Sequence, residues 1–246
     1  MMMDFAGKSL DLSAPHVMGI VNVTPDSFSD GGRFFSADKA LEQARKLVAD
    51  GATIIDIGGE STRPGSEPVG VEEEIRRVVP AIEAIHAELD VVISIDTMKA
   101  EVMRAAVTAG ASLINDVNAL RGDGALQAAA ELGVPVCLMH MQGSPQTMQQ
   151  QPHYSDVVSE VNEFLSERVA ACEAAGISRS KIILDPGFGF GKNARHNLRL
   201  MKHLSVITES DLPVLVGVSR KSIIGAMLNI SVEERLAGSL ALASIA

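Results

Sequence analysis

The chain of 246 residues is poor in several features, and each shortage excludes a class of protein. Aromatic residues make up 3% of it, with one tyrosine and no tryptophan, so the core must consist of Val, Ile, Leu, Ala and Met. Two cysteines, Cys137 and Cys172, are too few for a disulfide framework and predict free thiols in a reducing compartment. The first residues lack a secretory apolar run, and no uninterrupted apolar run approaches the roughly 18–20 residues of a membrane span. We therefore expect a cytoplasmic protein without a membrane partner.

Basic charge is also scarce, because the formal net charge is −10. Proteins that bind nucleic acids in general use basic surfaces to neutralise phosphates, so no nucleic-acid partner is expected. An anionic small molecule stays possible as a substrate, since local rather than net charge decides its binding.

Short apolar runs rich in β-branched residues recur at nearly even spacing, and helix-like segments separate them. Strands that alternate with helices predict parallel βαβ units, and no linker divides residues 1–246 into two domains. We therefore expect one α/β domain, a (β/α)8 TIM barrel with seven βα units visible, and an open doubly wound sheet is the alternative. The predicted strands are 16–23, 53–58, 91–96, 113–117, 135–140, 181–187 and 213–219, and the predicted helices are 37–50, 72–89, 99–109, 123–132, 155–175, about 196–208 and about 232–246.

An eighth unit is missing, because the sequence ends at Ala246 inside the seventh predicted helix. Seven strands alone would leave unpaired edges, which are a liability in sheet proteins. We expect the native chain to continue into an eighth strand; an unusual role for residues 1–13 is the alternative.

Three predicted strands end on Asp96, Asn115 and Asp185. A carboxylate at the end of a buried strand is costly unless it is paired, hydrated or bound, although capping of the next helix explains any one of them. In a barrel the carboxyl ends of all strands meet at one mouth. Two carboxylates and a carboxamide there suit a flat heterocycle with several N–H donors, such as a guanidine-like edge.

Further polar residues follow other strands. Arg220 and Lys221 come directly after 213–219, where barrels often bind anions, although surface lysines are usually only solvated. The glycines of DPGFGFGK (185–192) lack the spacing of a phosphate-binding loop and instead let the backbone approach a flat ligand. His140 has no partner at metal-ligand spacing and is interpreted as structural.

Eight blocks of the chain taken together resemble the dihydropteroate synthase family. They are MGIVNVTPDSFSDGG, GATIIDIGGESTRPG, ISIDT, INDV, LMHMQG, LDPGFGFGK, VGVSRKSIIG and ERLAGSLA, and they span residues 18–241 in the family's order. The resemblance implies a transferase of folate biosynthesis that joins 6-hydroxymethyl-7,8-dihydropterin diphosphate to 4-aminobenzoate. It also implies a TIM barrel, a homodimer, a Mg2+ cofactor and inhibition by sulfonamides.

The resemblance also assigns roles to residues. Asp96, Asn115 and Asp185 would grip the pterin edge, Lys221 its carbonyl side, and Asn22 would help to hold Mg2+ on the diphosphate. The loops 22–34 and 58–69 would close over the bound pterin as lids, which exclude water from a cationic intermediate. The catalytic residues would be Asp30, Arg63 and Lys221, and Thr62, Arg63, Phe28, Pro64, Phe190, Arg220 and Ser222 would surround the diphosphate and the aminobenzoate.

Three other functions compete with this one. A pterin-binding methyltransferase shares the barrel and the pterin grip, but the SRK segment (219–221) and the two complete loops favour the synthase. A non-catalytic or truncated pterin-binding protein would bind the pterin without turnover. A phosphosugar isomerase would need a glutamate base at a strand end, which is not evident.

Overall fold

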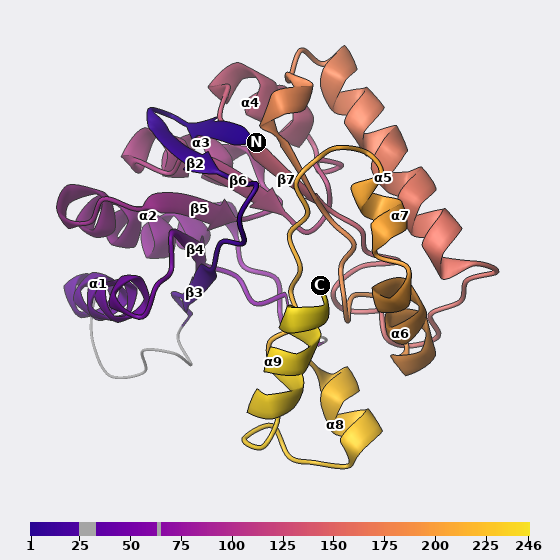
Figure 1. The fold of residues 1–246 in the computed structure, drawn as a ribbon. Helices are drawn as coiled ribbons and strands as arrows, with labels where there is room; N and C mark the ends of the chain where they lie inside the picture. The colour runs from indigo at the N-terminus through magenta and orange to yellow at the C-terminus, as the bar shows by residue number, and fades with distance from the viewer. Residues whose placement is uncertain (25–32, 63–64) are drawn as a thin grey trace.

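The computed structural model describes residues 1–24, 33–62 and 65–246. In these ranges the chain forms a parallel sheet with helices around it and a separate antiparallel hairpin at the N-terminus (Figure 1). No helix in the described ranges is both long and apolar enough to cross a membrane.

The parallel sheet has six strands, which pair strictly in chain order. Each lies within one of the first six predicted strands, so these six predictions are confirmed. A barrel is built in this way, because each βα unit adds its strand beside the previous one. The strands are β3 (Met18–Asn22), β4 (Ile54–Gly58), β5 (Val92–Asp96), β6 (Leu113–Asp116), β7 (Val136–Met139) and β8 (Ile182–Asp185).

The seventh predicted strand, 213–219, is much shorter than expected and makes a single parallel bridge between Leu184 and Val214. The N–H of Leu184 donates to the Pro213 carbonyl at 2.9 Å, and the N–H of Leu215 donates to the Leu184 carbonyl at 2.8 Å. In the part of the chain that the structure describes, no strand pairs with the other side of this segment. Pairing on one side only gives a ladder little support, and the segment leaves extended pairing after one bridge.

All seven predicted helices are present, with two differences. The predicted helix at about 196–208 is two helices, because His203 leaves helical geometry with φ −116° and ψ 29°. A further helix, which was not predicted, follows Lys221. The helices are α1 (Arg33–Ala49), α2 (Val71–Glu88), α3 (Ala100–Ala109), α4 (Ala125–Leu132), α5 (Val157–Ala174), α6 (Ala194–Lys202), α7 (Ser205–Thr208), α8 (Ser222–Leu228) and α9 (Leu236–Ile245).

The N-terminal hairpin of β1 (Met2–Phe5) and β2 (Lys8–Asp11) was not predicted as regular structure. Its tight turn is formed by Ala6 and Gly7, which both have positive φ, as in the turns that match the twist of a hairpin. Met3 and Phe5 are buried, and they pack against the inward-facing residues at the start of the parallel strands: Ile54, Val92, Leu113, Cys137 and Ile183. The hairpin therefore covers the amino-terminal end of the strands, and within the described residues it pairs with neither edge of the parallel sheet.

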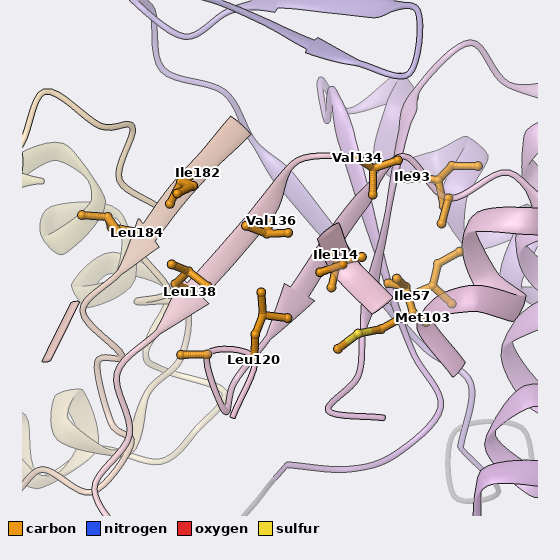
Figure 2. Close-up of a cluster of buried hydrophobic side chains, with 14 of the residues drawn as sticks. Ile57, Ile93, Met103, Ile114, Leu120, Val134, Val136, Leu138, Ile182 and Leu184 are labelled. Atoms are coloured by element: carbon orange, nitrogen blue, oxygen red, sulfur yellow. The ribbon is translucent and has the colours of Figure 1, made fainter. Parts of the chain in front are cut away.

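The main hydrophobic core lies between the sheet and the helices (Figure 2). Alternate strand residues point outward into this core, where they meet apolar helix residues such as Met103. Helix–sheet burial on this scale stabilises the fold by roughly 25 cal/mol for each Å² of apolar surface removed from water. The outward strand residues include Ile57, Ile93, Ile114, Val136, Leu138, Ile182 and Leu184.

Candidate active site at the carboxyl ends of the strands

The inner face of the sheet changes from apolar to polar along the strands. Ile54 and Val92 are register partners at the hairpin end, and two residues further on their places are taken by Asp56 and Ser94. Another two residues further, Asp96 aligns with Asn115 of β6. Because successive inward positions are two residues apart, these polar side chains share one interior. Asp185 reaches the same end of the sheet, aligned with Met139 of β7.

Asp96 is held in a strongly unfavourable electrostatic environment. Its Oδ1 is buried and accepts no hydrogen bond from any described residue. Burial raises the pKa of this carboxyl well above its usual value, and the negative charges of Asp56, Asp116, Glu74 and Glu60 raise it further. A ligand that brings N–H donors or positive charge would relieve this cost, so the carboxyl is prepared for such a partner.

Asp185 ends β8 and is oriented by the loop that follows it. Its Oδ1 accepts a 2.7 Å hydrogen bond from the backbone N–H of Gly187. Burial raises its pKa to about 6, against the opposing effects of that hydrogen bond and of the positive charges of Lys221 and Lys192. Gly187 has φ +68°, and a Cβ there would collide with the His140 carbonyl oxygen, so only glycine suits this turn.

Lys221 lies at the start of α8 with its ammonium group 4.6 Å from the centre of the Phe190 ring. The lysine side chain also lies against Gly189 and Gly217, where a Cβ would be in van der Waals contact with it. Burial lowers the pKa of Lys221, and the charge of Asp185 opposes that effect. The geometry therefore brings a cation, an aromatic face and a carboxylate together at one side of the mouth.

A second lysine, Lys192, holds the glycine-rich loop against β7. Its ammonium group lies 2.9 Å from His140 Nδ1 and donates to the carbonyl oxygens of His140, Gly187 and Phe190 at 3.2, 2.9 and 3.0 Å. Burial lowers the pKa of Lys192 to about 7 and that of His140 to about 3, so His140 is neutral at pH 7. This contact agrees with the structural interpretation of His140.

Asn22 ends β3 beside Asp96. Asn22 Oδ1 and Asp96 Oδ2 each lie 3.6 Å from the position that a Cβ on Gly58 would take. Mg2+ prefers oxygen ligands and commonly keeps several waters, so one carboxamide oxygen together with substrate phosphates is a suitable donor set. In the described part of the chain, no three His, Cys, Asp or Glu side chains are grouped to bind a metal on their own.

The remaining predicted site residues fall into two groups. Thr62 is half-buried, Ser222 is exposed in the first turn of α8, and Arg220 is exposed with φ 49° while its backbone N–H donates to Ser239 Oγ at 2.8 Å. The second group, Phe28, Asp30, Arg63 and Pro64, lies outside the described residues. The predictions for the loops 22–34 and 58–69 rest largely on these four residues.

Known proteins are similar to this chain in both sequence and fold. A family model described as "Pterin binding enzyme" matches residues 18–246. The dihydropteroate synthase of Escherichia coli K12 is 58% identical over 240 residues, which cover 98% of this chain and 85% of that protein. The chain belongs to the dihydropteroate synthase family of pterin-binding enzymes. The Haemophilus influenzae member is 53% identical over 239 residues, 97% of this chain and 87% of its own length.

Solved structures of the dihydropteroate synthase family superpose on nearly the whole chain. That of Yersinia pestis, in complex with a sulfonamide drug, has a TM-score of 0.94 at 53% identity and covers 100% of this chain and 89% of its own. That of Xanthomonas albilineans, in complex with 7,8-dihydropteroate, has a TM-score of 0.89 at 49% identity and covers 100% and 88%. These likenesses confirm the predicted α/β barrel class.

Sequence reasoning missed two buried polar residues of this dihydropteroate synthase site. Asp56 stands in the middle of the apolar run TIIDIG, and an acidic residue at an inward strand position was a usable signal. Lys192 was included in DPGFGFGK only as the end of a glycine-rich loop. Its burial, at 3% exposure, depends on carbonyl groups from two loops and has no local sequence signal.

Proposed function

We propose that the chain joins 6-hydroxymethyl-7,8-dihydropterin diphosphate to 4-aminobenzoate and releases 7,8-dihydropteroate and diphosphate. One observation carries this proposal: strands β5, β6 and β8 bring Asp96, Asn115 and Asp185 to one end of the barrel interior. Two findings on related proteins support the proposal. Similar proteins are named dihydropteroate synthases, and one related structure contains 7,8-dihydropteroate.

The pterin would bind at this polar end through its N–H-rich edge. Asp96 and Asp185 would accept its donors, which replaces the unfavourable burial of two carboxyls by charge-assisted hydrogen bonds. Asn115 would add a carboxamide, and Lys221 would donate to the carbonyl and ring-nitrogen side. Phe190, which already lies beside Lys221, would flank the binding region of the aminobenzoate.

The diphosphate would lie beside Asn22, at the end of β3. Mg2+ held by Asn22 and phosphate oxygens would neutralise negative charge on the departing group. Thr62, Arg63, Arg220 and Ser222 would contact the diphosphate or the aminobenzoate, with Phe28 and Pro64 at the edge of that region. Sulfonamides would compete with aminobenzoate, as suggested by the drug complex of the Yersinia pestis relative.

The reaction would proceed through early breakage of the C–O bond to the diphosphate, which leaves a cationic dihydropterin methylene. Fixed carboxylates stabilise such a cation, with Asp30 proposed to contribute one of them. The amine of aminobenzoate then attacks the methylene carbon and loses a proton. An aryl amine is already neutral near pH 7, so no strong general base is needed. Closure of the loops 22–34 and 58–69 would exclude water, which competes for the cation.

The decisive experiment follows the formation of 7,8-dihydropteroate from the two substrates with Mg2+, together with titration calorimetry. We expect turnover, and aminobenzoate binding only after diphosphate is present. Binding of the pterin diphosphate without product would instead favour the alternative of a non-catalytic pterin-binding protein. Absence of binding by folded protein would contradict the proposal.

The proposed setting is a homodimer in the cytoplasm. It rests on the family resemblance and on the two cysteines, Cys137 and Cys172, which are buried and unpaired. Sedimentation velocity at micromolar concentration tests the dimer, and a monomer at all concentrations would contradict it.

A further inference from the structure

Asp56 is a buried carboxyl for which the proposed reaction has no use. It lies in the middle of β4, one inward position closer to the hairpin end than Gly58, and it is 4% exposed. Its Oδ1 has no hydrogen-bond partner among the described residues. Burial of a carboxyl group in a strand interior costs free energy, so we expect this residue to have a specific role.

The hydrogen bond of Asp56 leads to the proposed pterin site. Asn115 Nδ2 donates to Asp56 Oδ2 at 3.2 Å. Asn115 aligns with Asp96, which aligns with Gly58, so Asp56 lies one level below Asn115 in the barrel interior. The amide nitrogen of Asn115 therefore faces down toward Asp56, and the carbonyl Oδ1 lies on the opposite branch of the carboxamide.

The chemistry of the two groups favours this orientation when Asp56 is ionised, and burial, which raises the pKa of Asp56, acts against that state. An ionised carboxylate can only accept hydrogen bonds, whereas a carboxamide has a donor end and an acceptor end. Only the nitrogen end of Asn115 can face an ionised Asp56 favourably. An apolar residue at position 56 would leave that nitrogen without a partner, and an amide at position 56 would pair with either end.

We propose that Asp56 is a positioning residue, which fixes the Asn115 carboxamide with Oδ1 turned toward the mouth to accept an N–H of the pterin. This inference rests on the proposed function. Asp56 would thereby contribute to specificity, because a ligand that presents an N–H to Asn115 is favoured over one that presents an acceptor.

The test compares Asp56→Asn and Asp56→Leu with the unaltered protein, and Ser94→Ala is the matched control. Ser94 is the register partner of Asp56 and is also buried, so Ser94→Ala removes a buried polar neighbour of Asp56 and leaves the contact between Asp56 and Asn115 in place. The probes are 6-hydroxymethyl-7,8-dihydropterin diphosphate and its lumazine analogue, in which an oxo group replaces the 2-amino group. Calorimetry gives the Kd of each, and thermal melting shows whether each variant is folded.

For Asp56→Leu we expect the pterin Kd to rise about tenfold, which corresponds to about 1.4 kcal/mol for a lost buried hydrogen bond. For Asp56→Asn we expect a rise of about twofold, since about half of the Asn115 side chains would then be turned the wrong way. The preference for pterin over lumazine should fall in Asp56→Asn and stay unchanged in Ser94→Ala. A purely structural role would lower the melting temperature and leave this preference unchanged.

Two results would overturn the inference. One is an unchanged preference for pterin over lumazine in Asp56→Asn, which is nearly the same size as the native side chain and is expected to fold even if Asp56→Leu does not. The other is a loss of affinity in Asp56→Asn as large as in Asp56→Leu, which would assign the effect to charge instead of orientation. Asp185→Asn separates this from failure of the proposed function, because unchanged pterin binding in that variant would contradict the pterin site itself.

Discussion

The two ends of the barrel interior are built from the same strands and serve opposite purposes. At the amino-terminal end, Met3 and Phe5 of the hairpin pack on Ile54, Val92 and other apolar residues, and the layer is sealed. At the carboxyl end, Asp185 and the Oδ1 atom of Asp96 are buried, and burial raises the pKa values of both carboxyls. One layer gains stability from burial and the other loses it, which is the usual cost of a site prepared for a ligand.

The largest expected effect concerns the sealed end. Phe5→Ala should lower the free energy of unfolding by about 3–5 kcal/mol, because it removes a fully buried ring and leaves a cavity. Urea unfolding followed by circular dichroism measures this change. Met2→Ala on the exposed face of the same strand is the control and should change stability by less than about 0.5 kcal/mol. Equal effects of the two variants would show that the hairpin does not seal the barrel.

The next effect concerns activity at the polar end. Asp185→Asn should lower kcat/KM for the pterin substrate about 100-fold, or about 2.7 kcal/mol, because a neutral amide replaces a charged acceptor. Steady-state assay of dihydropteroate measures it. Asp50→Asn removes an exposed carboxylate between α1 and β4, at the amino-terminal end of the strands, and should leave kcat/KM unchanged. A fall of less than threefold in Asp185→Asn would remove Asp185 from the proposed site.

The same variant should gain stability, which sharpens the contrast between the two ends. The pKa of Asp185 is about 6 in the folded protein against 3.8 normally, so the folded state holds this proton more tightly. Unfolding free energy contributed by Asp185 therefore falls as the pH rises from about 4 to 6 and stays low above that range. The Asp185→Asn variant does not lose this stability. Its free energy of unfolding at pH 7 should therefore be higher than that of the unaltered protein by up to about 3 kcal/mol. Denaturant titrations at pH 4.5 and 7 measure it, and an equal difference at both would contradict the cause given.

The smallest expected effect concerns the chemical reactivity of the two cysteine thiols. Burial raises the pKa of Cys137 well above its usual value, with the charges of Asp185 and Asp56 adding to it, and burial raises that of Cys172 to about 11. Neither thiol should react measurably with a disulfide reagent at pH 8, because the thiolate is the reactive form. Both should react after unfolding in denaturant. Rapid labelling of Cys137 in the folded protein would show that the barrel interior opens.

The repeated βα pattern was readable from the sequence because each of these strands is a continuous apolar run between helix signals. The positions of Asp96, Asn115 and Asp185 at strand ends were equally readable, and the register brings Asp96 and Asn115 into alignment. The hairpin was not foreseen, since short strands such as KSLD lack a strong pattern and gain their burial only against the barrel. The short seventh strand likewise reflects missing pairing on one side, which no local sequence expresses.

Sequence alone thus determined how the six parallel strands alternate with helices, the family and the residues at the ends of these strands, because these depend on local periodicity and on matching blocks. Only the tertiary structure decided which buried polar residues contact the site and the loop that follows β8. The bond from Asn115 to Asp56 joins residues 59 positions apart, and the Lys192 contacts to His140 join residues 52 positions apart. Such pairs form because the barrel brings distant strands to a common interior, where a buried polar group must find its partner.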